Sequence, residues 1–423
     1  MGRLSLVSRR GAIGAGSTIA GERHGGLFAS LQLYRDYRLL WLSTVFTQIG
    51  QWMLTITLGW LILTLTNSAA WVGLVAFASG LPFILVSVPA GVLIDRVDQR
   101  RLLVACQAAA IAIGLGLALL ATLGLAQPWH LLLASFLNGA VLAINSATRQ
   151  TLVPTFVARE HLGNAIGLMS AGQNVTRILG PSLGGPAIAL LGSAGALYLQ
   201  SGFLLAALIN TVMLPAVLPR GGKALALRRN LTDGLAVIWH SPALLGLMIL
   251  ATIPSLLVFP YLQFLPVYAR DILRIGASGL GLLFTASGIG AVTGALLVAG
   301  AQALPRKGQL ILGGTLLYTL IIIGFAYARW VPLSLLLIFG CGALGSFYMG
   351  LNNTLLHLHV DDEMRGRVMG VYTLTSGLST LGALPMGFLG ARIGVPSAIG
   401  IAAALTFLIT AAAALRLRTL REL

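Results

Sequence analysis

A single arginine lies deep inside one of the apolar segments of this chain. If that segment begins at Gly163, Arg177 lies 14 residues further on, about 21 Å along a helix that rises 1.5 Å per residue. This depth is near the middle of a bilayer core about 30 Å thick, where a charged side chain costs about 2.5–3.5 kcal/mol. Gln173 is one turn away on the same face. The pair indicates either a structural arginine bonded to polar neighbours or a cavity-lining cation that meets an anionic or hydrogen-bonding substrate.

A stripe of polar side chains follows one face of the first apolar segment. Thr44, Gln48 and Gln51 recur at helical spacing, and Thr55 continues the series, so all four share one helix face. A polar stripe inside an apolar segment predicts a water-filled cavity. The alternative is that these groups form hydrogen bonds between packed helices.

Polar and aromatic side chains share a face in three further segments, the fourth, seventh and tenth. In the fourth, Asn138 and Asn145 lie on one face together with Arg149. The residues that we expect to line a substrate cavity are Thr44, Gln48, Gln51, Asn138, Asn145, Gln173, Arg177, Tyr261, Tyr268, Tyr348 and Asn352.

None of the 11 acidic residues lies in the middle of an apolar segment. A buried carboxylate is the usual proton carrier of a transporter, so the sequence argues against a conventional proton antiport. Protons stay a candidate coupling ion through Asp95 or through a titrating substrate.

Residues of the types that bind metals or nucleotides do not form a convincing site. His357 and His359 precede three acidic residues, but a solvated turn accounts for this pattern. Cys106 and Cys341 are too far apart in sequence for a metal-binding spacing, and the chain has no phosphate-binding loop motif. We therefore expect no metal, no cofactor and no enzymatic activity.

A cluster of charges, residues 91–101, separates the second apolar segment from the third. It contains Asp95 and Asp98 together with Arg96, Arg100 and Arg101. Such a cluster cannot lie in hydrocarbon, so it predicts a water-facing turn between two membrane spans. Its arginines favour the cytoplasmic side.

The composition excludes a soluble fold. The chain has 423 residues, of which 57% are hydrophobic and only 9% are charged, whereas soluble domains carry about 25% charged residues. It is predicted to be an all-α polytopic membrane protein. The net charge of +16 lies in short loops, so membrane topology explains it better than nucleic-acid binding does.

Twelve spans are predicted, six on each side of a basic linker. Their boundaries are 39–65, 69–94, 101–125, 129–151, 163–191, 194–218, 243–268, 278–304, 309–327, 331–357, 366–392 and 395–415. We expect a cytoplasmic tail and surface helix at 1–38, a first bundle at 39–218, a cytoplasmic linker at 219–242, a second bundle at 243–415 and a cytoplasmic tail at 416–423. With both termini in the cytoplasm, 22 of the 27 basic residues lie on the inner side.

The two halves of the chain repeat each other. A shift of 203 positions superposes several glycines, for example Gly91 on Gly294, Gly139 on Gly342 and Gly184 on Gly387. Two parallel six-span repeats are a usual architecture of alternating-access transporters.

The charge cluster resembles the signature loop of the major facilitator superfamily, whose pattern is roughly G-x-x-x-D-R-x-G-R-R. Gly91, Asp95, Arg96 and Arg100 match it, whereas Asp98 stands in place of the glycine. The resemblance extends over nearly the whole chain and implies the major facilitator fold of two six-helix repeats. Residues 63–68, 148–150 and 365–370 are similar to those of enterobactin exporters and macrolide-efflux-like proteins.

The fifth segment is similar to a motif of drug antiporters in the same superfamily. Gly167, Gly180 and Pro181 match it, as do Gly184 and Gly185, whereas Thr176 replaces a glycine. Small residues let helices approach closely, and proline bends them. The residues that the resemblance implies for conformational gating are Gly91, Asp95, Arg96, Arg100, Gly180, Pro181, Gly184, Gly185, Gly366 and Arg367.

The resemblance implies a secondary active transporter of the cytoplasmic (inner) membrane. We expect it to export amphipathic small molecules, such as drugs or siderophore-like compounds, and to act as a monomer in the lipid bilayer. Uptake or lipid flipping on the same fold is the first alternative, and a membrane scaffold without transport is the second.

Overall fold

The computed structural model describes residues 26–217, 227–301, 306–416 and 418–422, and all of their regular structure is helical. The helices are α1 (Ala29–Leu33), α2 (Arg35–Thr66), α3 (Ala69–Arg96), α4 (Gln99–Thr122), α5 (Pro128–Phe156), η1 (Arg159–His161), α6 (Leu162–Val212), α7 (Leu227–His240), α8 (Pro242–Leu257), η2 (Phe259–Phe264), α9 (Leu265–Val267), η3 (Tyr268–Ile272), α10 (Gly276–Ala301), α11 (Lys307–Tyr327), α12 (Val331–His359), α13 (Asp362–Ile393), α14 (Val395–Arg416) and α15 (Arg418–Glu422). Residues 1–25 of the predicted tail and residues 219–226 of the predicted linker lie outside the described residues, whereas α7 forms most of the rest of that linker.

Within the described ranges, nine helical stretches are long and apolar enough to cross a membrane. One of them, 159–212, has 54 residues, well beyond the roughly 20 that a single span needs. Gly192 interrupts it with φ +70°, a conformation that glycine adopts without strain. The break lies between the two spans predicted on either side of it.

The seventh predicted span, 243–268, is not a continuous α-helix. α8 ends at Leu257, and the chain continues through the 3₁₀-helix η2, the short α9 and the π-helix η3. Pro260 and Pro266 each lack the N–H that an α-helix needs at that position. The sequence predicted the extent of this segment but not its irregular second half.

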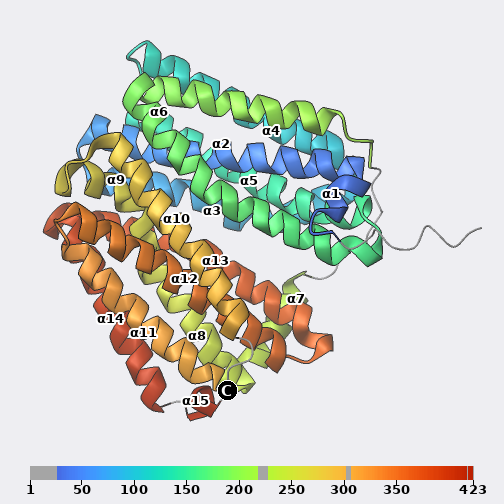
Figure 1. The fold of residues 1–423 in the computed structure, drawn as a ribbon, viewed down its shortest axis with the longest axis vertical. Helices are drawn as coiled ribbons and strands as arrows, with labels where there is room; N and C mark the ends of the chain where they lie inside the picture. Colours follow the sequence, from blue (N-terminus) through green and yellow to red (C-terminus); the bar gives the residue numbers. More distant parts are fainter. Residues whose placement is uncertain (1–25, 218–226, 302–305, 417, 423) are drawn as a thin grey trace, which may run out of the picture.

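The helices form two groups. Figure 1 shows α2–α6 packed together, in blue to green, and α8–α14 packed together, in yellow to red. The groups meet mainly where α3 packs on α13 and α6 packs on α10. α7, which follows the undescribed part of the linker, packs on α13 and α8.

Small residues allow the two groups to touch through their backbones. A methyl group added to Gly73 in α3 would lie 2.4 Å from the carbonyl oxygen of Ala383 in α13. One added to Gly185 in α6 would lie 2.6 Å from the Cα of Gly281 in α10. Side chains larger than hydrogen therefore do not fit at these crossings.

These contacts lie at one end of the molecule. Arg270 of η3 reaches across at the same end and donates hydrogen bonds to the carbonyl oxygen of Leu63 (2.7 Å) and to Asn67 Oδ1 (2.9 Å). A methyl group added to Gly91 or Gly366, near the opposite ends of α3 and α13, would meet no atom within 4 Å. The groups therefore touch at the end of Asn67 and Arg270 and separate toward the end where α1 and α7 lie (Figure 1).

Candidate functional site

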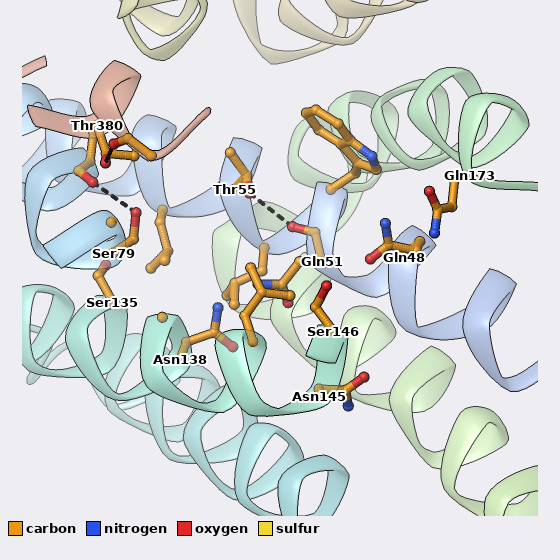
Figure 2. Close-up of a pocket in the computed structure, with 18 of the residues that line it drawn as sticks. Gln48, Gln51, Thr55, Ser79, Ser135, Asn138, Asn145, Ser146, Gln173 and Thr380 are labelled. Atoms are coloured by element: carbon orange, nitrogen blue, oxygen red, sulfur yellow. Dashed lines mark hydrogen bonds between the residues drawn. The ribbon is translucent and has the colours of Figure 1, made fainter. Parts of the chain in front are cut away.

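A cavity of about 520 Å³ lies between the two groups, mostly against the first. α2, α3, α5 and α6 supply nearly all of its wall, and the second group contributes Gln263, Gly377 and Thr380. At the closed end Gly80 packs against Thr380, because a methyl group on this glycine would overlap the threonine side chain. Figure 2 shows Ser79 and Thr380 on that side of the cavity.

Neutral polar side chains form much of the cavity wall. Gln48 and Gln51 come from α2, and Ser135 and Asn138 come from α5 (Figure 2). The hydroxyl of Ser135 is buried and has no hydrogen-bond partner among the described residues. Buried polar groups are normally paired with protein or water, so this wall is suited to a polar occupant.

One charged side chain, Arg149 of α5, belongs to the wall formed by the described residues. It is only 7% exposed. Its Nε donates to Asn145 Oδ1 at 2.6 Å, and its terminal nitrogens donate to neutral oxygens of α2: Thr44 Oγ1 (2.7 Å), Thr47 Oγ1 (3.0 Å), Ser43 Oγ (3.1 Å) and the Leu40 carbonyl (3.5 Å).

Helical spacing explains how this cluster forms. Arg149 follows Asn145 by one turn of α5, and its acceptors lie on consecutive turns of α2, which packs on α5. Gln107 of α4 supports the same acceptors by donating to Ser43 Oγ at 3.0 Å and to Thr47 Oγ1 at 3.4 Å. The guanidinium is thus fixed in position, and no carboxylate pairs with it among the described residues.

Six of the eleven residues predicted for the cavity lie on its wall. They are Thr44, Gln48, Gln51, Asn138, Asn145 and Gln173. Whether they contact a substrate stays a prediction.

Arg177 does not belong to this wall, although it lies close to one of its residues. Its guanidinium carbon is 5.9 Å from the ring centre of Trp52, which does line the cavity. The arginine is therefore close to an aromatic ring of the cavity wall. This arrangement is a cation–π contact.

The remaining predicted residues lie inside the second group of helices. Tyr261, Tyr268, Tyr348 and Asn352 are each at most 2% exposed, and none of them lines the cavity. Tyr268 donates a hydrogen bond to the carbonyl oxygen of Ala326 (2.9 Å), and Asn352 donates one to that of Leu247 (3.0 Å). In this structure these groups act as packing and hydrogen-bonding residues.

The predicted gating residues occupy several different places. Gly180 and Gly184 pack α6 closely on α2, where a methyl group on Gly180 would lie 2.5 Å from Trp52 Cβ. Gly185 lies at the crossing of α6 and α10, where a methyl group on Gly281 would lie 2.9 Å from the carbonyl oxygen of Pro181.

The charged gating residues lie at the separated end. Arg100 donates to the carbonyl oxygen of Val212, and Arg367 forms an ion pair with Asp233 of α7 at 2.9 Å. Gly91, Gly366 and Arg96 are exposed. Asp95 is in α3, but its side chain lies outside the part of the chain that the structure describes.

Sequence reasoning did not select Arg149 or Ser135 for the cavity. A signal for Arg149 was present, because it shares a helix face with Asn138 and Asn145. Arg149 was counted instead among the basic residues of the inner side, because it lies near the end of its predicted span. The side chain of Ser135 did not by itself predict a place on the wall, since one hydroxyl in a membrane helix usually bonds to its own backbone.

Comparison with known proteins identifies the family. A family model described as transmembrane secretion effector matches residues 27–423. The chain belongs to this family of major facilitator superfamily transporters. It is thus a multi-pass membrane protein of a transporter family rather than of an enzyme family.

Relatives with known names are efflux pumps and transporters. The multidrug efflux pump Tap of Mycolicibacterium fortuitum is 27% identical, over 88% of this chain and 93% of the pump. The staphyloferrin A transporter of Staphylococcus aureus is 24% identical, over 86% and 91% of the two chains. Macrolide efflux protein A of Streptococcus pyogenes is 22% identical, over 85% and 90%.

Solved structures with the same fold are transporters too. A POT family transporter in complex with 5-aminolevulinic acid has a TM-score of 0.74 at 12% identity, over 94% of this chain and 98% of that one. A bacterial homologue of the lysosomal transporter Spinster, inward-facing and occupied, has a TM-score of 0.70 at 16% identity, over 92% and 96%. At such identities the likeness shows the fold alone.

Proposed function

We propose that this transporter is a secondary active exporter of amphipathic small molecules in the cytoplasmic membrane. The observation that carries the proposal is the cavity between the two helix groups, closed at the end of Asn67 and Arg270, with a largely neutral polar wall that includes the unpaired hydroxyl of Ser135. An alternating-access transporter needs such a central site, open to one side at a time. The named relatives support outward transport, since two of the three are called efflux proteins.

Twelve spans with both termini in the cytoplasm are part of this proposal. The nine apolar stretches become ten spans when Gly192 divides the longest one, and α3 and α13 bring the number to twelve. The distribution of arginine and lysine supports the orientation. With this topology the separated end faces the cytoplasm, from which an exporter collects its substrate.

The polar wall is the proposed substrate contact. Gln48, Gln51 and Asn138 supply amide donors and acceptors, and Trp52 supplies an aromatic surface. Together these groups suit a molecule with an apolar body and a few polar atoms. The lipid bilayer and this small molecule are the proposed partners, and the transporter works as a monomer.

Transport into inside-out membrane vesicles tests the proposal against its alternatives. An exporter accumulates a fluorescent amphipath inside these vesicles, an uptake transporter depletes it, and a scaffold does neither. Asn138→Leu should lower the accumulation at least tenfold, because it removes the amide from the wall at similar size. Depletion of the probe by the unmodified protein would contradict export.

A further inference from the structure

The charge balance of the cavity is one-sided. Among the described residues of its wall, Arg149 is charged and none is acidic. The sequence offers no carboxylate elsewhere in the membrane interior, since every Asp and Glu lies at a helix end or in a loop in our assignment. The cavity therefore carries a buried positive charge that no described side chain neutralises.

The hydrogen bonds of Arg149 satisfy its geometry without cancelling its charge. Each of the five N–H positions of a guanidinium can donate one bond, and five neutral oxygens accept from Arg149. Dipoles of hydroxyl and amide groups stabilise a cation but leave its net charge in place. In a cavity walled by low-dielectric helices that charge is felt over several ångströms.

Asn145 completes the site on the cavity side. Its amide oxygen accepts the 2.6 Å bond from Arg149, so its amide nitrogen is left as a donor. No hydrogen bond from this nitrogen is formed within the described residues, although Asn145 is only 5% exposed and lines the cavity. An N–H donor held against a fixed cation is suited to a carboxylate or another anionic oxygen.

A second cation adds to the same positive potential. Arg177 lies 5.9 Å from the ring centre of Trp52 and forms no ion pair among the described residues. Its charge is therefore near the cavity, although its side chain is not part of the wall. Two unneutralised cations near one cavity repel a cationic substrate and attract an anionic one.

We propose that this exporter selects amphipaths that carry a negative charge, with Arg149 and Asn145 forming the anion-binding part of the cavity. The inference rests on the proposed function and adds the substrate class to it. Arg149 supplies the fixed charge, Asn145 supplies a donor, and Trp52 with the amide-lined wall holds the remainder of the molecule.

Three fluorescent probes with one common ring system and different charges test this selection. Dansylglycine is anionic, dansylglycinamide is neutral and dansylethylenediamine is cationic. Their affinities for the purified full-length protein, and their transport in proteoliposomes, are measured at one pH and one salt concentration. We expect the anion to bind at least tenfold more tightly than the cation, with the neutral probe between them.

Four variants assign the preference to the site. Arg149→Lys keeps the charge and should keep the order of affinities, and Arg159→Gln, which removes an exposed arginine outside the cavity, should leave it unchanged. Arg149→Gln should bring the anion-to-cation ratio near one. Asn145→Asp places a carboxylate on Arg149 and keeps the hydrogen bond between them, so it should also bring the anion-to-cation ratio near one. This variant tests the proposal even if Arg149→Gln does not fold.

The outcomes separate the two proposals. Equal transport of all three probes would leave the exporter in place and overturn the charge selection. An unchanged affinity ratio in folded Asn145→Asp protein would also overturn it. Transport of none of the probes would contradict the exporter and its selectivity together.

Discussion

Two arginines of the apolar segments differ in their relation to the cavity. Arg149 belongs to the wall, whereas Arg177 contacts Trp52 of the wall without lining the cavity itself. The depth of Arg177 could be predicted from the length of its segment. Which face of the helix meets the cavity depends on the rotation of α6 against α2, and the close packing of Gly180 on Trp52 sets that rotation.

Replacement of Arg177 should lower the transport of every probe, and that of the anionic probe most. Arg177→Ala loses a cation–π contact worth about 0.5–2 kcal/mol and frees the ring of Trp52, so the melting temperature and the transport of the neutral probe should fall. The anionic probe should lose more, because one of the two positive charges near the cavity is removed. Arg177→Lys keeps a cation near the ring and should retain most of both. Thermal unfolding in detergent measures the melting temperature, and proteoliposomes with the dansyl probes measure the transport. A loss confined to the anionic probe would instead indicate direct contact with the substrate.

Helix positions could be predicted well from the sequence, and helix regularity less well. Apolar length was sufficient to place a boundary between two spans at 191–194, and the structure breaks α6 there, at Gly192. The second half of the seventh segment was not predictable in detail, because proline removes a backbone donor but does not dictate whether a 3₁₀-turn or a π-turn replaces the lost bond. The cavity residues of α2 could be predicted from their helical periodicity. The tyrosines predicted for the cavity instead pack in the interior of the second helix group and do not line the cavity.

Two glycines of α6 give a matched test of the crossing with α10. Gly185→Ala would place a methyl group 2.6 Å from Gly281 Cα, while Gly202→Ala meets no atom within 4 Å. We expect Gly202→Ala to raise stability by up to about 1 kcal/mol through helix propensity. Gly185→Ala should lower it by about 1–3 kcal/mol through overpacking. Thermal unfolding of both variants checks the difference, and equal melting temperatures would contradict this crossing.

Loss of the Arg270 contacts should weaken the closed end. Arg270→Ala removes two hydrogen bonds to the segment around Asn67, each worth about 0.5–1.5 kcal/mol. The population with that end open should rise several-fold. Distances between spin labels on the two helix groups would measure it. Arg274→Ala, an exposed arginine at the same end, is the control and should leave the distances unchanged.

For the molecule as a whole, coupling should not depend on a carboxylate in the cavity. Single neutralisation of each acidic residue except Asp95 should leave part of the transport driven by a pH gradient, because none of these residues lies in the membrane interior of our assignment. Proteoliposomes with an imposed pH gradient provide the measurement. Complete loss of transport in one such variant that still folds normally would contradict this prediction. It would show that the replaced carboxylate is required for coupling.

The backbone contacts between the two helix groups have a kinetic consequence. Where Gly73 meets Ala383 and Gly185 meets Gly281, the touching surfaces contain almost no side chains with rotamers to rearrange. Such surfaces can roll over one another without the entropy changes that accompany the release of longer side chains. At these two crossings the barrier to rolling then resides mainly in the polar bonds nearby, those of Arg270 and the 2.7 Å bond between Ser182 and Thr285. The turnover rate of this transporter should therefore respond far more to those few bonds than to the extent of the contact itself.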